Sequence, residues 1–139
     1  RILREQSSVL EVRRTGLDVA GGILNSLWRI EPANREVIAI LLPRLATTDQ
    51  LQRLNIATWL VRFDPGEAHG IGVLAEYASK GTERVRRELA IRDLKKAGPA
   101  ARAATPALKA ATADPDKYIR RAARSALESI ERDESASVR

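Results

Sequence analysis

The chain has 139 residues, the length of one domain, and 44% of them are apolar, which argues against wholesale disorder. It carries 24 Lys plus Arg against 18 Asp plus Glu, a net charge of +6, with one His and no Cys. A disulfide framework, a thiol nucleophile and a thiolate zinc site are therefore excluded, and a cytoplasmic location is expected rather than export. No uncharged apolar run approaches the roughly 18 residues of a membrane span.

The spacing of apolar residues predicts a chain of helices, and no stretch alternates with period two as a strand would. The expected helices cover residues 9–29, 33–46, 50–63, 66–80, 83–97, 100–113 and 116–132. Gly16, Gly21 and Gly22 weaken the first, which is expected either to be broken or to cross another helix closely at Gly21-Gly22. Pro43 is expected to kink its helix, whereas Thr105-Pro106 is compatible with a fresh helix start.

Two of these segments differ in which faces are apolar. Helix 50–63 is apolar almost all round, which predicts an internal position with neighbours on several sides. Helix 116–132 instead carries one apolar stripe, with Arg121, Arg124 and Glu128 on the opposite side. It is therefore expected to lie on the surface.

Two Asp-Pro pairs are predicted to start helices. In Asp64-Pro65, Asp64 is expected to cap the helix, Pro65 to take its first position and Glu67 to place an acid in its first turn. The segment 114–116, Asp-Pro-Asp, repeats most of this pattern.

The chain repeats one pattern at a regular interval. An apolar residue, a small or acidic residue and a Pro recur at 30–32, 63–65 and 97–99, at steps of 33 and 34. Apolar columns accompany them, for example Leu27, Leu60 and Leu94. One further step takes Arg87 to Arg120, which begins a fourth unit. Such a period is typical of stacked helical hairpins.

The most regular part of the chain resembles a known family. Residues 97–108, the Asp-Pro-Asp at 114–116 and the apolar and basic pattern from Ile119 to Leu127 resemble the bacterial form of the HEAT repeat. The resemblance implies an all-α fold, a right-handed α-solenoid of about three and a half HEAT-like, armadillo-like hairpins. The expected organisation is one such domain over residues 1–132, within a longer parent chain, followed by a disordered tail at 133–139 that is removable without loss of stability.

In this family an Asp before the first helix of a hairpin and an Arg within it line a structural ladder between repeats. Asp114 and Arg120 match these positions, and Asp49 and Arg53 are a second match. The third unit departs from the pattern, because Gly81 stands where the acid would precede Arg87.

HEAT-like solenoids include scaffolds, nucleic-acid binders and a few enzymes, so function has to come from residues. Metal-dependent hydroxylases of this fold hold iron with several His-Glu pairs, whereas His69 is the sole His here. Trp28, Trp59 and Asp64 are the only counterparts of the residues with which a base-excising family acts, and packing and capping explain them better. No catalytic residue, cofactor or metal site is predicted.

Two surfaces are candidates for binding. The second helices of the hairpins should form the concave face, where the exposed residues carry mixed charge: Arg35, Glu67, His69, Glu76, Arg102 and Lys109. The first helices should form the outer face, which concentrates positive charge in a basic patch: Arg86, Arg87, Arg120, Arg121 and Arg124. Residues 81–139 hold 14 Lys plus Arg against nine acids, so nearly all of the net charge lies in this half.

The sequence thus predicts a monomeric, non-enzymatic protein-interaction or scaffold module whose partner is another protein or another domain of the parent chain. The alternative is a basic HEAT-like solenoid that binds nucleic-acid backbone.

Overall fold

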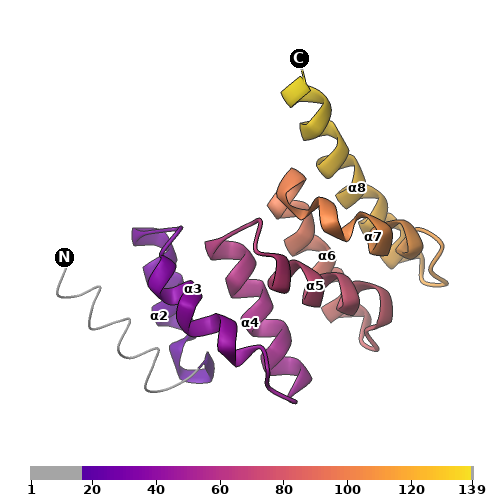
Figure 1. The fold of residues 1–139 in the computed structure, drawn as a ribbon. Helices are drawn as coiled ribbons and strands as arrows, with labels where there is room; N and C mark the ends of the chain where they lie inside the picture. Colours follow the sequence, from indigo (N-terminus) through magenta and orange to yellow (C-terminus); the bar gives the residue numbers. More distant parts are fainter. Residues whose placement is uncertain (1–16, 139) are drawn as a thin grey trace. The chain divides into compact units, whose positions relative to one another are not determined.

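The chain is a series of helices joined by short turns (Figure 1). The structure, a computed structural model, describes residues 17–138, with side chains from 22 to 132. Within this range there is no strand, which confirms the prediction of an all-α fold. The chain divides between Asp64 and Pro65 into two compact units.

The first unit contains α2 (Leu17–Ile30), α3 (Arg35–Arg44) and α4 (Gln50–Phe63). The second contains α5 (Ala68–Lys80), α6 (Arg84–Ala97), the 3-10 helix η1 (Gly98–Ala104), α7 (Thr105–Ala111) and α8 (Lys117–Val138). The bounds of α4 are those predicted from the sequence.

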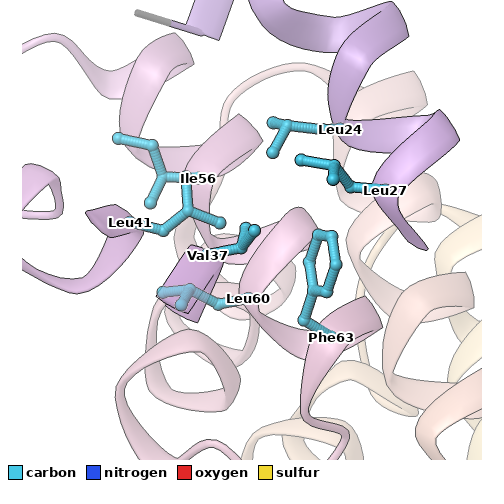
Figure 2. Packing of buried hydrophobic residues seen from close by; sticks show 7 residues of the cluster. All are labelled: Leu24, Leu27, Val37, Leu41, Ile56, Leu60 and Phe63. Atoms are coloured by element: carbon cyan, nitrogen blue, oxygen red, sulfur yellow. The ribbon is translucent and has the colours of Figure 1, made fainter. Parts of the chain in front are cut away.

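The core of the first unit forms where α2 and α3 pack against α4. Figure 2 shows its buried side chains converging from the three helices: Leu24, Leu27, Val37, Leu41, Ile56, Leu60 and Phe63. Leu60 is fully buried, and Trp28 and Trp59 pack against the edge of the cluster. Helix α4 supplies three of these seven residues, in keeping with its nearly continuous apolar surface.

Two side-chain caps fix the helix starts in this unit. The carboxamide oxygen of Asn34 accepts hydrogen bonds from the backbone N–H groups of Glu36 and Val37, and Asp49 caps α4 in the same way. These caps satisfy N–H groups that have no partner within the helix. The cap at Asn34 was not predicted from the sequence.

In the second unit, helices one sequence period apart lie side by side. Helix α6 packs against α8, and α5 packs against η1 and α7. The two layers are held together by contacts of α5 with α6 and of α7 with α8. Ala90 and Ala123, which are one period apart, are both buried, so the period in the sequence corresponds to equivalent places in the packing.

The predicted helix starts at the two Asp-Pro pairs are wrong by two or three residues. Asp64 caps the C-terminal end of α4 instead, and its N–H bonds the carbonyl of Leu60. Helix α5 starts at Ala68, with Glu67 as its cap. A displacement of two residues occurs before α8, where Asp116 rather than Asp114 accepts a hydrogen bond from the N–H of Tyr118. In both cases the Pro lies in the turn, and the acid that follows it supplies the cap.

The helix predicted at 100–113 is divided. Helix α6 ends at Ala97 and is capped by Gly98, whose φ of 64° suits glycine and whose N–H bonds the carbonyls of Leu94 and Lys95. The 3-10 helix η1 follows, and α7 starts at Thr105, immediately before Pro106. Because Pro has no N–H and its ring clashes with the carbonyl four residues earlier, Pro106 suits the start of a helix and not its interior.

Other boundaries also differ from the predictions. Helix α3 ends one residue after Pro43, whereas a kink had been expected within a helix running to 46. A Cβ added at Gly22 would meet no atom of the described residues within 4 Å, so Gly22 makes no close helix contact with them, and the crossing expected at Gly21-Gly22 stays a prediction. Residues 9–16 of the predicted first helix lie outside the described part of the chain.

Helix α8 continues to Val138, although a disordered tail was expected from residue 133. Acidic residues, Arg and Ala are compatible with a continuing helix, so the polar composition after Ile130 does not by itself show where α8 ends. That these last residues are removable without loss of stability stays a prediction.

Candidate functional site

An ion pair connects α6 with the loop before α8. Arg87, on α6, donates from Nη2 to the Asp114 carboxylate over 2.6 Å and from Nε to the carbonyl of Ala78 over 3.0 Å. The two charged side chains are only 12% and 15% exposed. The Arg87 hydrogen bond, with another from the N–H of Asp116, holds the pKa of Asp114 below its ordinary value. The acid therefore stays ionised and ties the loop before α8 to α6.

This ion pair corrects the expected pattern of the ladder. The absence of an acid at Gly81 had suggested that Arg87 lacks a ladder partner, but Arg87 bonds the acid of the following hairpin. Arg120, which was matched to the ladder together with Asp114, donates from Nη1 to the backbone carbonyls of Asp114 and Pro115.

At the second predicted ladder position, the Asp49 carboxylate caps the first turn of α4, accepting from the N–H groups of Leu51 and Gln52. A ladder role for Asp49 and Arg53 stays a prediction.

A basic groove lies along α8. Its volume is about 410 Å³. Its described lining comes from positions three, four and seven apart, one face of the helix: Lys117, Arg120, Arg121, Arg124, Ser125 and Glu128. We call this face the α8 stripe. Arg121 and Arg124 are exposed, and neither makes an ion pair with another residue whose side chain the structure describes.

The predicted basic patch is thereby divided into two groups. Arg87 is neutralised by Asp114, and Arg86 is paired with Glu83 at 2.6 Å. Arg120, Arg121 and Arg124 instead come together in the α8 stripe. Lys117 belongs to the same stripe but was missed, although its place one turn before Arg120 and Arg121 could have revealed it.

Two of the predicted concave-face residues bind each other. The Glu67 carboxylate caps α5 by accepting from the N–H of Gly70 and lies 2.9 Å from Nδ1 of His69. Burial alone would raise the pKa of Glu67, but the hydrogen bonds from Gly70 and His69 outweigh it and lower the pKa. The Glu67 side chain is 9% exposed against 75% for His69, so His69 is the accessible member of the pair.

The other candidates on the second helices are exposed. Glu76 lies on α5, Arg102 on η1 and Lys109 on α7, all in the layer that packs α5 against η1 and α7. Arg35 is exposed at the first position of α3, in the first unit. A binding role for these residues stays a prediction.

The residues weighed for catalysis have structural contacts. Trp28 donates from Nε1 to the carbonyl of Arg62 over 3.1 Å. The centre of the Trp59 ring lies 6.2 Å from that of the Phe63 ring, and the Arg62 guanidinium lies 5.0 Å from the centre of the Trp59 ring. Between residues 22 and 132, no three His, Asp or Glu side chains gather closely enough to hold a metal ion.

Comparison with known proteins gives no family assignment. The chain has no match among protein-family models and no significant match among curated proteins or solved structures. Among the helices that the structure describes, none is both long and apolar enough to cross a lipid bilayer. The functional argument therefore rests on the residues themselves.

Proposed function

We propose that the chain is a HEAT-like helical-repeat module, of the α-solenoid type, that binds another protein or another domain of its parent chain without catalysing a reaction. The observation that carries the proposal is the packing of the second unit, where α6 and α8 lie side by side one period apart. The ion pair between Arg87 and Asp114 supports it further, since it joins successive hairpins. Repeat proteins are stabilised by such contacts between neighbouring repeats and use the resulting surface for binding.

The layer of α5, η1 and α7 is the proposed protein-binding surface. It presents His69, Glu76, Arg102 and Lys109, a set with both signs of charge. A surface of mixed charge is suited to the polar surface of another protein, whereas a nucleic-acid backbone offers a single sign. The cap formed by Glu67 fixes the start of α5 and thereby the position of His69.

A binding role also fits the chemistry of the available side chains. The chain has no Cys, and its one His interacts with a capping carboxylate. An acid-base or nucleophilic site needs a nucleophile and a base in mutual reach, with a group that orients the base. The contacts described for Trp28, Trp59 and His69 serve packing and capping instead.

Site-specific photocrosslinking tests the proposed surface. A photoreactive residue placed at Lys109, exposed on α7, should crosslink a defined protein in cells of the source organism. The matched control position is Arg92, exposed on α6 in the other layer, which should not yield that product. Identical products from both positions, or none from Lys109, would contradict a protein-binding surface at α5, η1 and α7.

The second candidate function is binding to nucleic-acid backbone, and the α8 stripe is the observation that favours it. Lys117, Arg121 and Arg124 are exposed cations on one face of one helix. Binding to phosphates releases counterions, so it weakens steeply as salt rises. The salt dependence of duplex binding therefore separates this candidate from the first.

A further inference from the structure

The α8 stripe corresponds, one period later, to the face of α6 that α8 covers. Three contacts define that face of α6. The Arg84 guanidinium lies 4.8 Å from the centre of the Tyr118 ring, Arg87 binds Asp114, and Lys95 donates to the Ser125 hydroxyl over 2.7 Å. Arg84 and Tyr118 lie near the starts of α6 and α8, and Lys95 and Ser125 lie further along the same two helices, so α6 and α8 run parallel.

Arg87 and Arg120 are one sequence period apart. The same step of 33 residues relates the face of α6 that packs against α8 to the α8 stripe. Arg84, Arg87, Glu88, Ile91 and Lys95 correspond in order to Lys117, Arg120, Arg121, Arg124 and Glu128. All five of the later residues line the groove on α8. The α8 stripe therefore occupies the same position on α8 as the face of α6 that packs against a parallel helix. It is placed to pack against a further helix that runs parallel to α8.

The chemistry of the two faces differs at the centre. Ile91 is 1% exposed beneath its neighbours, whereas its counterpart Arg124 is exposed. Arg121 stands where α6 has the acid Glu88, and Glu128 stands where α6 has the base Lys95. An apolar helix face would leave these charges without partners in a desolvated contact, which is costly. The occupant must therefore bring acidic groups opposite residues 117–124 and a basic group opposite residue 128.

Arg120 indicates where one of those acids belongs. Its counterpart Arg87 uses Nη2 to hold the carboxylate of Asp114, in the turn that leads into the packed helix. Arg120 uses Nη1 for two backbone carbonyls, and its Nη2 makes no hydrogen bond with the described residues. A carboxylate at the start of an incoming helix would complete the same arrangement.

We infer that the α8 stripe binds an acidic α-helix of a partner protein, lying parallel to α8. The partner helix carries Asp or Glu in its first two turns and Lys or Arg about one turn later. The stripe from residue 117 to 128 is about 16 Å long at 1.5 Å per residue, which matches three turns of such a helix. This surface is separate from the layer of α5, η1 and α7, and either binds without requiring the other.

The acid within the stripe argues against a nucleic-acid backbone as the occupant. The Glu128 side chain is 70% exposed, and its contact with Arg132 is a 4.0 Å pair in solvent, which does little to neutralise it. A continuous line of phosphates would meet Glu128 with like charge. A helix of mixed sign can complement the whole stripe.

Peptide binding to the complete chain tests the inference. The probe is a fluorescent, helix-stabilised peptide long enough to span the stripe, with Glu in the first two turns of one face and Lys in the third. A scrambled peptide of equal composition and helicity controls for net charge, and a 20-base-pair DNA duplex tests the alternative. The ordered peptide should bind at least tenfold more tightly than either.

Charge reversal locates the binding. The variant R121E/R124E should weaken binding of the ordered peptide at least tenfold, and a peptide with Lys in place of its Glu residues should restore it. The matched control, R92E/K96E, reverses two exposed cations on α6 and should change the affinity less than threefold. The neutral variant R121Q/R124Q, checked by circular dichroism, gives the same test should the reversed charges disturb folding.

Each outcome decides the inference. Equal affinity for ordered and scrambled peptides, or no binding of either, would overturn it. So would equal losses in the stripe and control variants, because these would leave net charge as the cause. Tighter binding of the duplex than of the ordered peptide, lost in R121E/R124E, would assign the stripe to nucleic acid.

Discussion

The two units of the chain bury different kinds of side chains. In the first, Leu60 and Phe63 belong to a cluster of large residues, and Ala57 is the one buried Ala among its described positions. In the second, about half of the described buried apolar residues are Ala: Ala78, Ala90, Ala101, Ala104, Ala111, Ala123 and Ala126.

The difference indicates that different kinds of contact stabilise the two units. Large side chains stabilise the first unit chiefly through buried apolar area. Small side chains contribute less area but allow helices to approach closely, and the second unit adds polar ties from Arg87 to Asp114 and from Lys95 to Ser125. The first unit should therefore be most sensitive to truncation, and the second to enlargement and to loss of charge pairing.

The largest expected effect is truncation in the first core. Leu60→Ala removes a fully buried side chain from the centre of the cluster and should lower the free energy of unfolding by about 2 to 5 kcal/mol. Urea denaturation followed by circular dichroism measures the change. Glu128→Ala, at an exposed position on α8, should remain within about 0.5 kcal/mol. A Leu60→Ala variant as stable as the parent would refute the central place of Leu60.

Enlargement should be the damaging change in the second unit. Ala123 is fully buried on α8, so Ala123→Leu forces extra volume into a close helix contact and should cost about 1 to 3 kcal/mol. Ala110→Leu, at an exposed position on α7, is the matched control and should be nearly neutral. Thermal melting of both variants decides whether the alanines are close-packed, since equal melting temperatures would mean that they are not.

Loss of the ion pair should cost somewhat less. Asp114→Asn removes the charged acceptor of Arg87 and should lower the free energy of unfolding by about 1.5 kcal/mol. A double-mutant cycle with Arg87→Gln isolates the coupling between the two side chains. A coupling near zero would show that the pair does not stabilise the contact between α6 and the loop before α8.

The same pair predicts a pH dependence. The pKa of Asp114 is lower in the folded protein than its ordinary value of 3.8, so the stabilisation is fully present above that value. It is lost as pH falls through the folded-state pKa, where the carboxylate takes up a proton. The stability difference between the parent and Asp114→Asn should therefore narrow in acid. A constant difference down to pH 2 would contradict the assigned role.

The smallest expected effect is a gain. Gly72 lies inside α5, and a Cβ at this position would meet no atom of the part of the chain that the structure describes within 4 Å. Gly72→Ala should stabilise the second unit by about 0.5 to 1 kcal/mol through helix propensity. Gly81→Ala is the contrasting variant, because its Cβ would lie 2.5 Å from the carbonyl oxygen of Tyr77. Melting temperatures that move in the same direction for both would contradict this contrast.

Regular features of the fold were predictable because they repeat in the sequence. The bounds of α4 follow from its apolar residues, and the sequence period predicted that Ala90 and Ala123 hold equivalent places. Helix starts were less predictable. In 64–67 and 114–116 an acid stands on each side of the Pro, so composition alone does not say which one caps the helix.

Contacts between distant residues were the least predictable part of the candidate site. Arg87 and Asp114 are 27 positions apart, and the expected ladder included Arg120 with Asp114 but not Arg87. The sequence grouped Arg86 and Arg87 with the other cations because it does not show that both are paired. Helical spacing could have predicted that Lys117 belongs to the α8 stripe, since it precedes Arg121 by four residues.

Binding of a 20-base-pair duplex at 50 and 200 mM salt tests the central claim, a protein-binding module, against its closest alternative. We expect a dissociation constant weaker than about 1 μM near physiological salt, with a shallow dependence, because the α8 stripe offers few cations and includes an acid. A submicromolar affinity near physiological salt that falls steeply as salt rises would contradict the account and assign the chain to nucleic-acid binding.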